Sequence, residues 1–581
     1  MCGADGLRKE QILKEIRQSL TKPVVSIGTQ DFEFIRKNHF FYVDKTSFIE
    51  EWWENGDAVT LITRPRRFGK TLNMSMTEHF FSNQSVGKEE YFKDLAIWKN
   101  KDYRKLQGTY PVISISFAGI KGDTFESVRD AVIQVLIDVY AKYSFLLDGN
   151  TLKPQEKEYF DFVRPDMSDA VASMSMHRLA LCMYRYYGKK ALILLDEYDA
   201  PLQEAYVHGY WEALTTFISS LFHHTFKTNP YMERGLMTGI TRISKESIFS
   251  DMNNLEVITT TSEKYETAFG FTENEVIEAL KLFDLSENLE KIKYWYDGFS
   301  FGSRTDIYNP WSITKYLDRK KFDSYWANTS SNQLIGKLIR ESAPKVKMAV
   351  EDLLEGKQLI TELDEEIVFD QLNDSSEAIW SLLLTSGYLK VNRLIENSEE
   401  GSTLYSLSLT NLEVKKELKR IIQKWFQNPS IRYSDFIKAL LADDVVYMNQ
   451  YINQIALKIF SSFDTGNQPS EQAEPERFYH GFVLGLIVDL ANQYRITSNR
   501  ESGFGRYDVV MEPLAEGDHA VVMEFKVFNP AKEKDLKETV QNALQQIEPK
   551  AYDAELIARG ISKERIRHYG FAFEGKRVLI G

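Results

Sequence analysis

The sequence of 581 residues contains only two cysteines, Cys2 and Cys182. Two cysteines are too few for a disulfide framework or a cysteine-based zinc site, so a reducing compartment is expected. No apolar run approaches the roughly 18–20 residues that a bilayer-spanning helix needs, and no membrane association is expected. The first twenty residues lack the apolar core of a secretory signal, which favours a cytoplasmic location.

An excess of positive charge is also missing, because the formal net charge is −13. A strongly basic chain would indicate nucleic-acid binding through phosphate neutralisation. The acidic total lowers that expectation without excluding it, since one basic groove can coexist with acidic faces. The length predicts roughly three to four domains. The 43% hydrophobic and 13% aromatic content is typical of folded globular domains.

Four short and nearly continuous apolar runs alternate with helical patterns in the first half of the chain. Strands that are apolar on both faces are typical of a parallel sheet covered by helices. The first half therefore predicts an α/β fold around a parallel sheet. The four expected strands are Val59–Thr63, Val112–Phe117, Ala191–Leu195 and Gly235–Ile240.

A glycine–lysine–threonine turn follows the first expected strand and precedes a helical pattern. Backbone N–H groups at such a turn face a bound anion. Lys70 would reach the β- and γ-phosphates of a nucleotide, and the Thr71 hydroxyl would ligate Mg²⁺. Arg64 stands where the usual phosphate-loop pattern has its first glycine, so a basic helix start is an alternative interpretation. The candidate nucleotide-binding residues of this loop are Arg64, Pro65, Arg66, Arg67, Phe68, Gly69, Lys70 and Thr71.

The third expected strand ends in acidic residues, in the sequence ALILLDEYDAP from residue 191. Asp196 is placed to hold Mg²⁺, and Glu197 is placed to orient or deprotonate an attacking water. Taken alone, this is also an ordinary strand that ends in a charged turn. Because it follows a glycine–lysine–threonine turn in the order expected for a phosphate-binding loop, the pair of motifs favours a P-loop ATPase.

The fourth expected strand, GLMTGITRI, ends in polar residues. Either Thr238 or Thr241 could sense the γ-phosphate, and Arg242 could supply positive charge to it. Arg66 and Arg67 are alternative suppliers of that charge, and surface or ion-paired arginines are an equally good interpretation of all three.

The middle of the chain is mostly helical in pattern. Thr272 and Glu275 form the signature of a helix N-terminal capping box. Residues 378–409 read as one helix and two strands, resembling a small winged-helix-type unit. The expected organisation is an N-terminal helix at 1–23, an ATPase-like domain at 24–265, a helical middle region at 266–460, a polar linker at 461–476 and a final α/β domain at 477–581.

The last hundred residues contain a candidate metal site. Glu524 and Lys526 lie on one face of an expected strand because side chains alternate along strands. If that strand pairs with its predecessor through a turn at Leu514–Asp518, Asp508 comes close to Glu524. Two carboxylates and the Phe525 carbonyl make a hard oxygen site for Mg²⁺ or Mn²⁺, and Lys526 would position the nucleophile or neutralise charge. A solvated hairpin is the alternative interpretation of this pattern.

Other candidate features have simpler explanations. Trp52–Trp53 and the aromatic residues 294–301 could stack on bases, although core packing explains them as well. His480 is expected to be a packed histidine. His223–His224 has no partner at metal-ligand spacing, and no zinc site is expected.

Longer stretches of the first half resemble a known family. The string FYVDKTSFIEEWWENGDAVTLITRPRRFGKTLNMSM from residue 41, with LDEYDAP and the later YWYDGFSF and IYNPWS, is similar to the prokaryotic AAA-ATPase-like family. Members of that family carry arginine where the first loop glycine would be. The resemblance covers roughly residues 24–330. It implies a P-loop ATPase of the class with an extra catalytic glutamate, and it implies that residues 42–46 (YVDKT) pack near the nucleotide.

The block from residue 477 to 581 resembles the PD-(D/E)xK nuclease-superfamily domain that usually follows this ATPase. Carried over, Asp508, Glu524 and Lys526 match the catalytic positions of that superfamily. Tyr507 stands where the superfamily name places a proline, a position that is poorly kept. Gln546 and Tyr552 resemble its accessory motif, with Lys550 nearby, and Arg500 and Arg506 could bind phosphate or pair with Glu501 or Asp508.

These observations predict an ATP-binding and ATP-hydrolysing protein coupled to metal-dependent cleavage of nucleic acid, with DNA favoured over RNA. The alternatives are an ATP-driven switch that binds nucleic acid without cutting it, and a protein-assembly ATPase. A homo-oligomer is possible, because such ATPases often borrow an arginine from a neighbour. Expected cofactors are ATP and Mg²⁺, with Mn²⁺ possible at the nuclease site. The expected catalytic residues are Glu197, Asp508, Glu524 and Lys526, and the expected metal ligands are Thr71, Asp196, Asp508 and Glu524.

Overall fold

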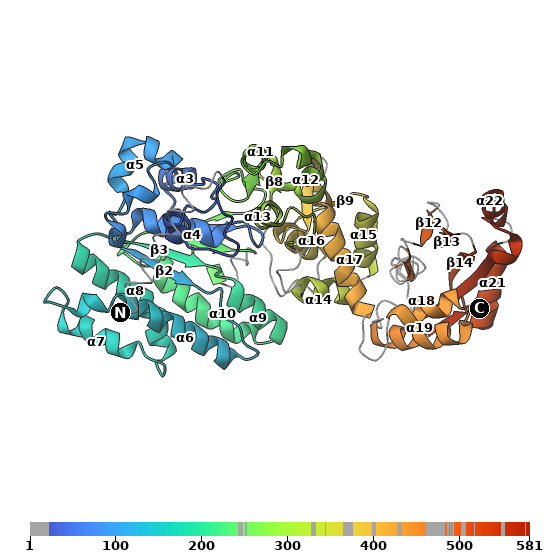
Figure 1. Ribbon diagram of the computed structural model, residues 1–581. Coiled ribbons are helices and arrows are strands. Elements are labelled where there is room, and N and C mark those ends of the chain that lie inside the picture. The colour runs from blue at the N-terminus through green and yellow to red at the C-terminus, as the bar shows by residue number, and fades with distance from the viewer. Residues whose placement is uncertain are drawn as a thin grey trace, which may run out of the picture. The chain divides into compact units, whose positions relative to one another are not determined.

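The computed structural model of the chain (Figure 1) divides into two compact units. Unit 1 comprises Met1–Leu334 and Ile360–Lys415, and unit 2 comprises Ile335–Leu359 and Lys416–Gly581. The structure describes residues 22–241, 248–249, 252–326, 333–342, 344–363, 376–397, 402–426, 433–459, 483–484, 487, 490, 493–500, 507–515, 517–547, 552–575 and 577–581.

A five-stranded parallel sheet forms the centre of unit 1, with the strand order β2-β3-β4-β1-β5. Helix α4 covers one face, and helices α6, α8 and α10 cover the other (Figure 1). Strands β1 and β3 are buried at every residue, as expected for strands covered on both sides. The predicted α/β fold with a parallel sheet is confirmed. The elements are β1 (Val59–Thr63), β2 (Val112–Ser116), β3 (Ala191–Asp196), β4 (Met232–Gly239), β5 (Leu255–Ile258), α4 (Lys70–Phe81), α6 (Phe125–Lys142), α8 (Asp169–Tyr187) and α10 (Trp211–Phe222).

Strand β4 separates the strand that precedes the phosphate loop from the strand that ends at Asp196. β1 pairs with β4 and β5, whereas β3 pairs with β2 and β4. All five strands run in the same direction, so their carboxyl ends meet at one edge of the sheet. Ligands of open α/β sheets bind at that edge. The loop after β1 and the acids after β3 therefore lie on the same side, with the end of β4 between them.

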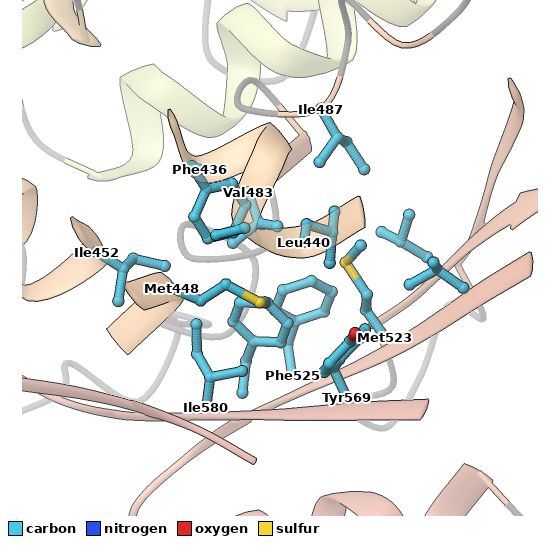
Figure 2. Close-up of a cluster of buried hydrophobic side chains, with 14 of the residues drawn as sticks. Phe436, Leu440, Met448, Ile452, Val483, Ile487, Met523, Phe525, Tyr569 and Ile580 are labelled. Carbon is cyan, nitrogen blue, oxygen red and sulfur yellow. The ribbon is translucent and has the colours of Figure 1, made fainter. Parts of the chain in front are cut away.

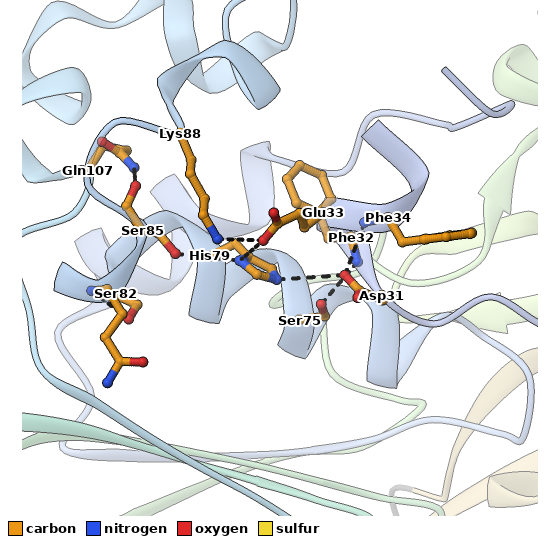
Figure 3. A network of polar contacts seen from close by, with 11 residues as sticks. Asp31, Phe32, Glu33, Phe34, Ser75, His79, Ser82, Ser85, Lys88 and Gln107 are labelled. Atoms are coloured by element: carbon orange, nitrogen blue, oxygen red, sulfur yellow. Dashed lines mark hydrogen bonds and ion pairs between the residues drawn. The ribbon is translucent and has the colours of Figure 1, made fainter. Parts of the chain in front are cut away.

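The segment before β1 is fastened to the phosphate-loop helix through helix α2 (Phe32–Lys37). The Phe32 backbone N–H donates to Ser75 Oγ of α4 at 3.0 Å. His79, also on α4, lies between two carboxylates, with Nε2 3.7 Å from Asp31 Oδ1 and Nδ1 3.7 Å from Glu33 Oε2. Figure 3 shows these side chains converging between the two helices. The N-terminal segment is thus held against the helix that carries Lys70 and Thr71.

The remaining elements of unit 1 include two small three-stranded sheets. The capping box predicted at the start of α11 is present, since the Thr272 N–H donates to Glu275 Oε2 at 2.7 Å. Trp52 is fully buried and packs edge-on against Phe81, which favours core packing for this residue. The elements are α3 (Ser47–Asn55), α5 (Lys101–Leu106), α7 (Pro154–Phe162), α9 (Ala200–His208), β6 (Phe271–Thr272), α11 (Glu273–Leu282), α12 (Leu289–Tyr296), β7 (Phe299–Phe301), β8 (Arg304–Tyr308), α13 (Pro310–Arg319), β9 (Leu359–Thr361), α16 (Ser376–Thr385), β10 (Leu389–Asn397), β11 (Ser402–Leu409) and the start of α17 (Leu412–Phe426), whose residues from Lys416 onward belong to unit 2.

Unit 2 contains a mixed five-stranded sheet in the order β12-β13-β14-β15-β16. β14 and β15 are parallel, and the other neighbouring pairs are antiparallel. The strands are β12 (Tyr494–Arg500), β13 (Tyr507–Pro513), β14 (Ala520–Val527), β15 (Ile566–Glu574) and β16 (Arg577–Ile580). The helices are α14 (Gln333–Glu341), α15 (Pro344–Glu355), α18 (Tyr433–Leu441), α19 (Val445–Ile459), α21 (Leu536–Ile547) and α22 (Tyr552–Ala558).

The two faces of β14 belong to different layers of unit 2. Val521, Met523 and Phe525 lie in the core beneath α18 and α19, whereas Ala520 and Val522 lie in the cluster beneath α21 and α22. This alternation places Glu524 on the α21 face. Figure 2 shows the first core, in which the helical residues Phe436, Leu440, Met448 and Ile452 gather with Met523, Phe525, Tyr569 and Ile580 of the sheet.

Some expectations fall on residues that the structure does not describe. These are most of the N-terminal helix at 1–23, the linker at 461–476, His480 and Arg242. The predicted domain boundaries and the winged-helix resemblance of residues 378–409 remain predictions. Among the helices in the described ranges, none is long and apolar enough to cross a membrane.

We predict that Leu440→Ala strongly destabilises unit 2. The Leu440 side chain is fully buried in the core beneath α18 and α19, so its truncation leaves a cavity and lowers the free energy of unfolding by about 2–5 kcal/mol. The control is Val446→Ala on α19, where the side chain is 69% exposed, and its effect is expected to stay within about 0.5 kcal/mol. Hydrogen exchange of peptides covering β14 across a urea series measures both. Equal effects of the two substitutions would contradict the packing described here.

Candidate functional site

A cavity of about 490 Å³ lies at the carboxyl edge of the unit 1 sheet. Its volume is within the range of about 300–1,000 Å³ that is usual for small-molecule sites. Its walls include the loop from Arg66 to Thr71, the acid loop at Glu197, and the segment that contains Tyr42, Val43 and Lys45. Further lining residues lie within 26–35, 118–121, 268–271 and 310–314. The segment that the family resemblance placed near the nucleotide therefore lines the same cavity as the phosphate loop.

The loop before α4 presents backbone N–H groups to this cavity. Arg67 and Gly69 have positive φ angles of 67° and 83°, and Gly69 is the N-cap residue of α4. No side chain caps the helix, and its first turn contains no acidic residue. The first N–H groups of such a helix lack intrahelical acceptors, and they favour an anion. The loop is therefore shaped to bind phosphate.

Lys70 is held inside the curve of this loop. Its Nζ donates to the carbonyl oxygens of Arg64 at 2.8 Å and Pro65 at 2.9 Å, and the residue is only 5% exposed. Burial lowers the pKa of Lys70, while the negative charges of Glu197 and Asp199 oppose that shift. The ammonium group thus lies between the loop carbonyls and the acidic strand end.

Asp196 joins the phosphate-loop helix to strand β4. Its Oδ2 accepts a hydrogen bond from Thr71 Oγ1 at 2.7 Å, and its Oδ1 accepts one from Thr238 Oγ1. Asp196 is 4% exposed and lies beside the cavity rather than on its wall. A hydroxyl and a carboxylate are hard oxygen donors of the kind that Mg²⁺ prefers. The residues present therefore fit a magnesium ion.

Glu197 adopts a backbone conformation that is rare for glutamate. Its φ is 52°, and its N–H donates to Thr238 Oγ1 at 3.3 Å. Such left-handed residues cost free energy and need support from their surroundings. The side chain lines the cavity, and burial raises its pKa while Lys70 opposes the increase. The geometry places a carboxylate with increased basicity next to the phosphate loop.

The structure separates the two threonines that sequence reasoning left as alternatives. Thr238 contacts Asp196 and Glu197, as described above. Thr241 instead donates from its N–H at 3.0 Å and its hydroxyl at 2.9 Å to Asp199 Oδ2. Asp199 is 1% exposed and positions the end of β4, a role that the sequence analysis missed. The sequence LDEYDAP does contain Asp199 as a third acid after Asp196 and Glu197, and this could have indicated such a role.

The four arginine and proline residues of the loop have different surroundings. The Arg64 guanidinium is fully buried, donates to the carbonyl oxygens of Thr63 at 2.9 Å and Thr259 at 2.6 Å, and does not line the cavity. Burial lowers the pKa of Arg64 to about 9. Pro65 is also absent from the cavity wall. Arg66 and Arg67 line it, with Arg66 Nη2 donating to Gln203 Oε1 at 3.1 Å and Arg67 stacking over Trp311 at 4.5 Å.

The second candidate site lies on β14 in unit 2. β13 and β14 pair in antiparallel fashion, and Asp508 is the register partner of Glu524. Glu524 is 1% exposed. When the Gln546 amide is oriented to satisfy both neighbours, its nitrogen donates to Glu524 Oε1 at 3.0 Å and its oxygen accepts from Lys526 Nζ at 3.2 Å. Helix α21 therefore brings Gln546 to the acid and the lysine of the strand.

Parts of this second site fall outside what the structure describes. They are Arg506, Lys550 and the side chains of Asp508, Tyr552 and Arg500. Within the described residues, no group of three or more histidine, cysteine, aspartate or glutamate side chains is arranged to hold a metal ion. The buried Glu524 carboxylate supplies the hard oxygen chemistry that suits Mg²⁺ or Mn²⁺.

Glu533 is an acidic neighbour of Lys526 that sequence reasoning missed. It accepts hydrogen bonds from Asn529 N at 3.0 Å, Thr539 Oγ1 at 2.9 Å and Asn542 Nδ2 at 2.7 Å. Burial raises its pKa, but these hydrogen bonds and the positive charge of Lys526 outweigh burial, so its pKa is lowered. Glu533 remains charged and holds negative charge close to Lys526.

The parallel sheet, the glycine–lysine–threonine turn and the acidic strand end define a P-loop nucleotide-binding fold in unit 1. Residues 26–249 match the family model described as a predicted AAA-ATPase, and residues 474–581 match that of the PD-(D/E)XK nuclease superfamily. The chain therefore carries an AAA-ATPase-like domain and a C-terminal PD-(D/E)XK nuclease-superfamily domain, as the sequence resemblance implied.

The chain is also similar to a protein from Azotobacter chroococcum mcd 1 that is described as an uncharacterized protein in the vnfD 5' region. The two are 25% identical over 584 residues, which cover 97% of this chain and 99% of the relative. The likeness thus extends over nearly the full length of both proteins, but the relative's description names no activity.

We predict that Gly270→Ala destabilises unit 1 through the phosphate loop. Gly270 has a φ of 85°, and an added Cβ would lie 2.5 Å from Ile307 Cγ2 and 3.0 Å from Phe68 Cδ1. Displacing these groups adds about 1–3 kcal/mol to the strain of the positive φ. The control is Gly188→Ala, with a φ of 65° and nothing within 4 Å of the added Cβ. Thermal unfolding measures both, and equal decreases in melting temperature would argue against the close approach at Phe68.

Proposed function

We propose that this protein hydrolyses ATP and couples that reaction to metal-dependent cleavage of nucleic acid. The main support for ATP hydrolysis is the hydrogen bond of 2.7 Å between Thr71 Oγ1 and the Asp196 carboxylate. It lies beside the buried Lys70 and the loop whose N–H groups suit phosphate. The AAA-ATPase-like and nuclease-superfamily matches in one chain support the pairing of the two reactions.

The residues of unit 1 would share the work of hydrolysis. The N–H groups of the loop bind the phosphates, and Lys70 neutralises charge on the transferred phosphoryl group. Thr71 and Asp196 would hold Mg²⁺, which when bound neutralises charge on the phosphate oxygens. Glu197 accepts the proton of the attacking water, and the Thr238 hydroxyl holds the Glu197 backbone in place. Arg66 or Arg67 would supply further positive charge from the cavity wall.

The residues of unit 2 would hold the metal and the phosphodiester. Asp508 and Glu524 would supply the carboxylates, which the pairing of their backbones supports. A divalent cation held by these carboxylates, Mg²⁺ or Mn²⁺, would polarise the phosphodiester and lower the pKa of a bound water. Lys526 positions that water or neutralises developing charge, and Gln546 keeps the acid and the lysine at a fixed separation. We propose DNA, rather than RNA, as the substrate.

A second candidate function is an ATPase that drives the assembly of proteins. The net charge of −13 favours it, because an acidic chain repels phosphate backbones at long range. A switch that binds nucleic acid without cutting it is a related alternative. Binding that survives removal of divalent metal by EDTA distinguishes that switch from a metal-dependent nuclease.

We predict that two substitutions separate the two activities. Lys70→Ala removes the positive charge at the phosphate loop and is expected to reduce ATP hydrolysis by about a hundredfold or more. Asp508→Ala removes a proposed metal ligand and is expected to abolish cleavage while leaving ATP hydrolysis intact. Purified proteins are incubated with plasmid, linear duplex, and single-stranded DNA and RNA, with Mg²⁺ or Mn²⁺, with and without ATP.

The matched controls are Lys190→Ala and Asp518→Ala, which alter exposed side chains and should behave like the wild type. Cleavage that is lost in Asp508→Ala and altered in Lys70→Ala supports the coupled nuclease. Intact ATP hydrolysis without cleavage of any substrate would instead favour the ATP-driven switch that binds nucleic acid without cutting it. Failure to bind any nucleic acid at low salt would favour the assembly ATPase.

We predict that the pH dependence of ATP hydrolysis reports on Glu197. A general base acts only when deprotonated, and burial raises the pKa of Glu197 above its ordinary value of 4.5. The rate of hydrolysis should therefore decrease as the pH is lowered. The midpoint of that decrease should lie at a higher pH than it would if the base were an exposed glutamate. Glu197→Gln should remove this acidic limb and lower kcat by about 10²–10⁴-fold. Glu212→Gln, at an exposed position, is the control, and an unchanged acidic limb in Glu197→Gln would assign the base elsewhere.

A further inference from the structure

A buried carboxylate outside both candidate sites is connected to the phosphate loop by hydrogen bonds. Glu413 is the second residue of α17 and is 1% exposed. Within the described part of the chain it forms no ion pair. Burial raises its pKa to about 7, and hydrogen bonds from the Trp326 N–H and the Ser312 hydroxyl oppose that increase. Such a group is costly to bury unless its hydrogen bonds are well formed. These two donors, with a backbone hydrogen bond from Tyr325, offset that cost.

One route from Glu413 to the loop runs through the start of α13. Glu413 Oε2 accepts from Ser312 Oγ at 2.8 Å. The Ser312 N–H in turn donates to Asn309 Oδ1 at 3.2 Å, and Asn309 Nδ2 donates to the carbonyl oxygen of Arg66 at 3.2 Å. Asn309 and Ser312 are both fully buried, so no water competes for these hydrogen bonds.

The other route is shorter and ends at the same atom. Glu413 Oε1 accepts from the Trp326 backbone N–H at 2.6 Å, and the indole Nε1 of Trp326 donates to the Arg66 carbonyl oxygen at 3.1 Å. One carbonyl of the phosphate loop therefore receives two donors, from Asn309 and Trp326. The Glu413 carboxylate contacts Trp326 directly and reaches Asn309 through Ser312. The two routes close a ring of hydrogen bonds around Glu413 and Arg66.

The next residue of the loop needs this support. Arg67 has a positive φ of 67°, which is unfavourable for a residue with a side chain. Its guanidinium stacks over Trp311, which directly precedes Ser312. The residues that Glu413 positions thus hold the loop at Arg66 and Arg67, immediately before the N–H groups that would bind phosphate.

We propose that Glu413 is a positioning residue for the phosphate loop, acting through Ser312 and Trp326 on the Arg66 carbonyl. This inference rests on the proposed nucleotide-binding function of unit 1 and assigns a role to a residue outside that site. α17 begins in unit 1, and its residues from Lys416 onward belong to unit 2. A shift of the Arg66 carbonyl on nucleotide binding would therefore change the hydrogen bonds of Glu413, in the first turn of this helix.

The test compares Glu413→Gln, Trp326→Phe and the double variant with the wild type. Glu413→Gln keeps the size of the side chain but replaces one acceptor oxygen with a donor. Trp326→Phe removes the indole donor to Arg66 and keeps an aromatic ring, although a smaller one, against Phe299 and Tyr388. The measured quantity is the dissociation constant for ATP with Mg²⁺, determined by calorimetric titration of the full chain. Glu278→Gln, at an exposed position of α11, is the matched control.

Each single substitution is expected to weaken ATP binding by about three- to tenfold, the range for losing one hydrogen bond. Because both substitutions act through the same carbonyl, their effects should not add. The dissociation constant of the double variant should therefore be at most about twofold higher than that of the more affected single variant. Effects that multiply, or an unchanged dissociation constant in Glu413→Gln, would overturn the proposal. If Glu413 had only a structural role in the core, Glu413→Gln would lower stability, but its effect on ATP binding would not depend on the presence of Trp326.

Hydrogen exchange of residues 412–426 in the wild type provides a second readout that needs no substitution. Exchange is expected to slow when ATP and Mg²⁺ are added, and an unchanged rate with ATP bound would contradict the link between Glu413 and the phosphate loop. Because this measurement uses the wild type, it remains valid if Glu413→Gln does not fold. If the wild type does not bind ATP, the proposed function fails and this inference with it. If it binds ATP but the two substitutions act independently, only the inference fails.

Discussion

The carboxylate of Asp196 is the point at which the separate parts of the ATPase-like domain meet. It ends strand β3, and it accepts one hydroxyl from the phosphate-loop helix and another from strand β4. Because β4 lies between β1 and β3, the loop and the acid share no sheet hydrogen bonds and are joined through these side chains. A buried carboxylate without such donors would be costly. The orientation of Glu197 depends on the same contact, since Thr238 also accepts its backbone N–H.

The loop that precedes α4 is poor in glycine, and neighbouring residues supply the rigidity that it needs. The Arg64 side chain is drawn into the interior by the carbonyls of Thr63 and Thr259, and Phe68 packs edge-on against Phe299 and Phe301. A loop with bulky side chains has fewer conformations to lose than one rich in glycine. Its shape is therefore determined jointly by the residues of the loop and by those near 299–326 that contact it.

Local patterns predicted the strands well, because each expected strand is a continuous apolar run. β1 has the predicted bounds, β2 and β3 differ by one residue, and β4 begins three residues earlier than expected. The pairing of Asp508 with Glu524 followed from an intervening turn. Contacts between distant residues were not predictable, such as that of Glu413 with Ser312 across 101 positions. Strand alternation also could not decide between Thr238 and Thr241, because Thr238 lies near the end of β4 and Thr241 lies beyond that end, where the alternation no longer applies.

The strand order also has a consequence for the order in which the protein is made. β1 and the phosphate loop are synthesised early, but both sheet neighbours of β1, β4 and β5, come about 170 residues or more later in the chain. At a translation rate of about 5–20 residues per second, β1 waits on the order of ten seconds or longer for its first partner. During that interval its apolar residues have no sheet to join. The nascent chain therefore exposes an apolar segment until β4 has been synthesised, and this interval favours aggregation.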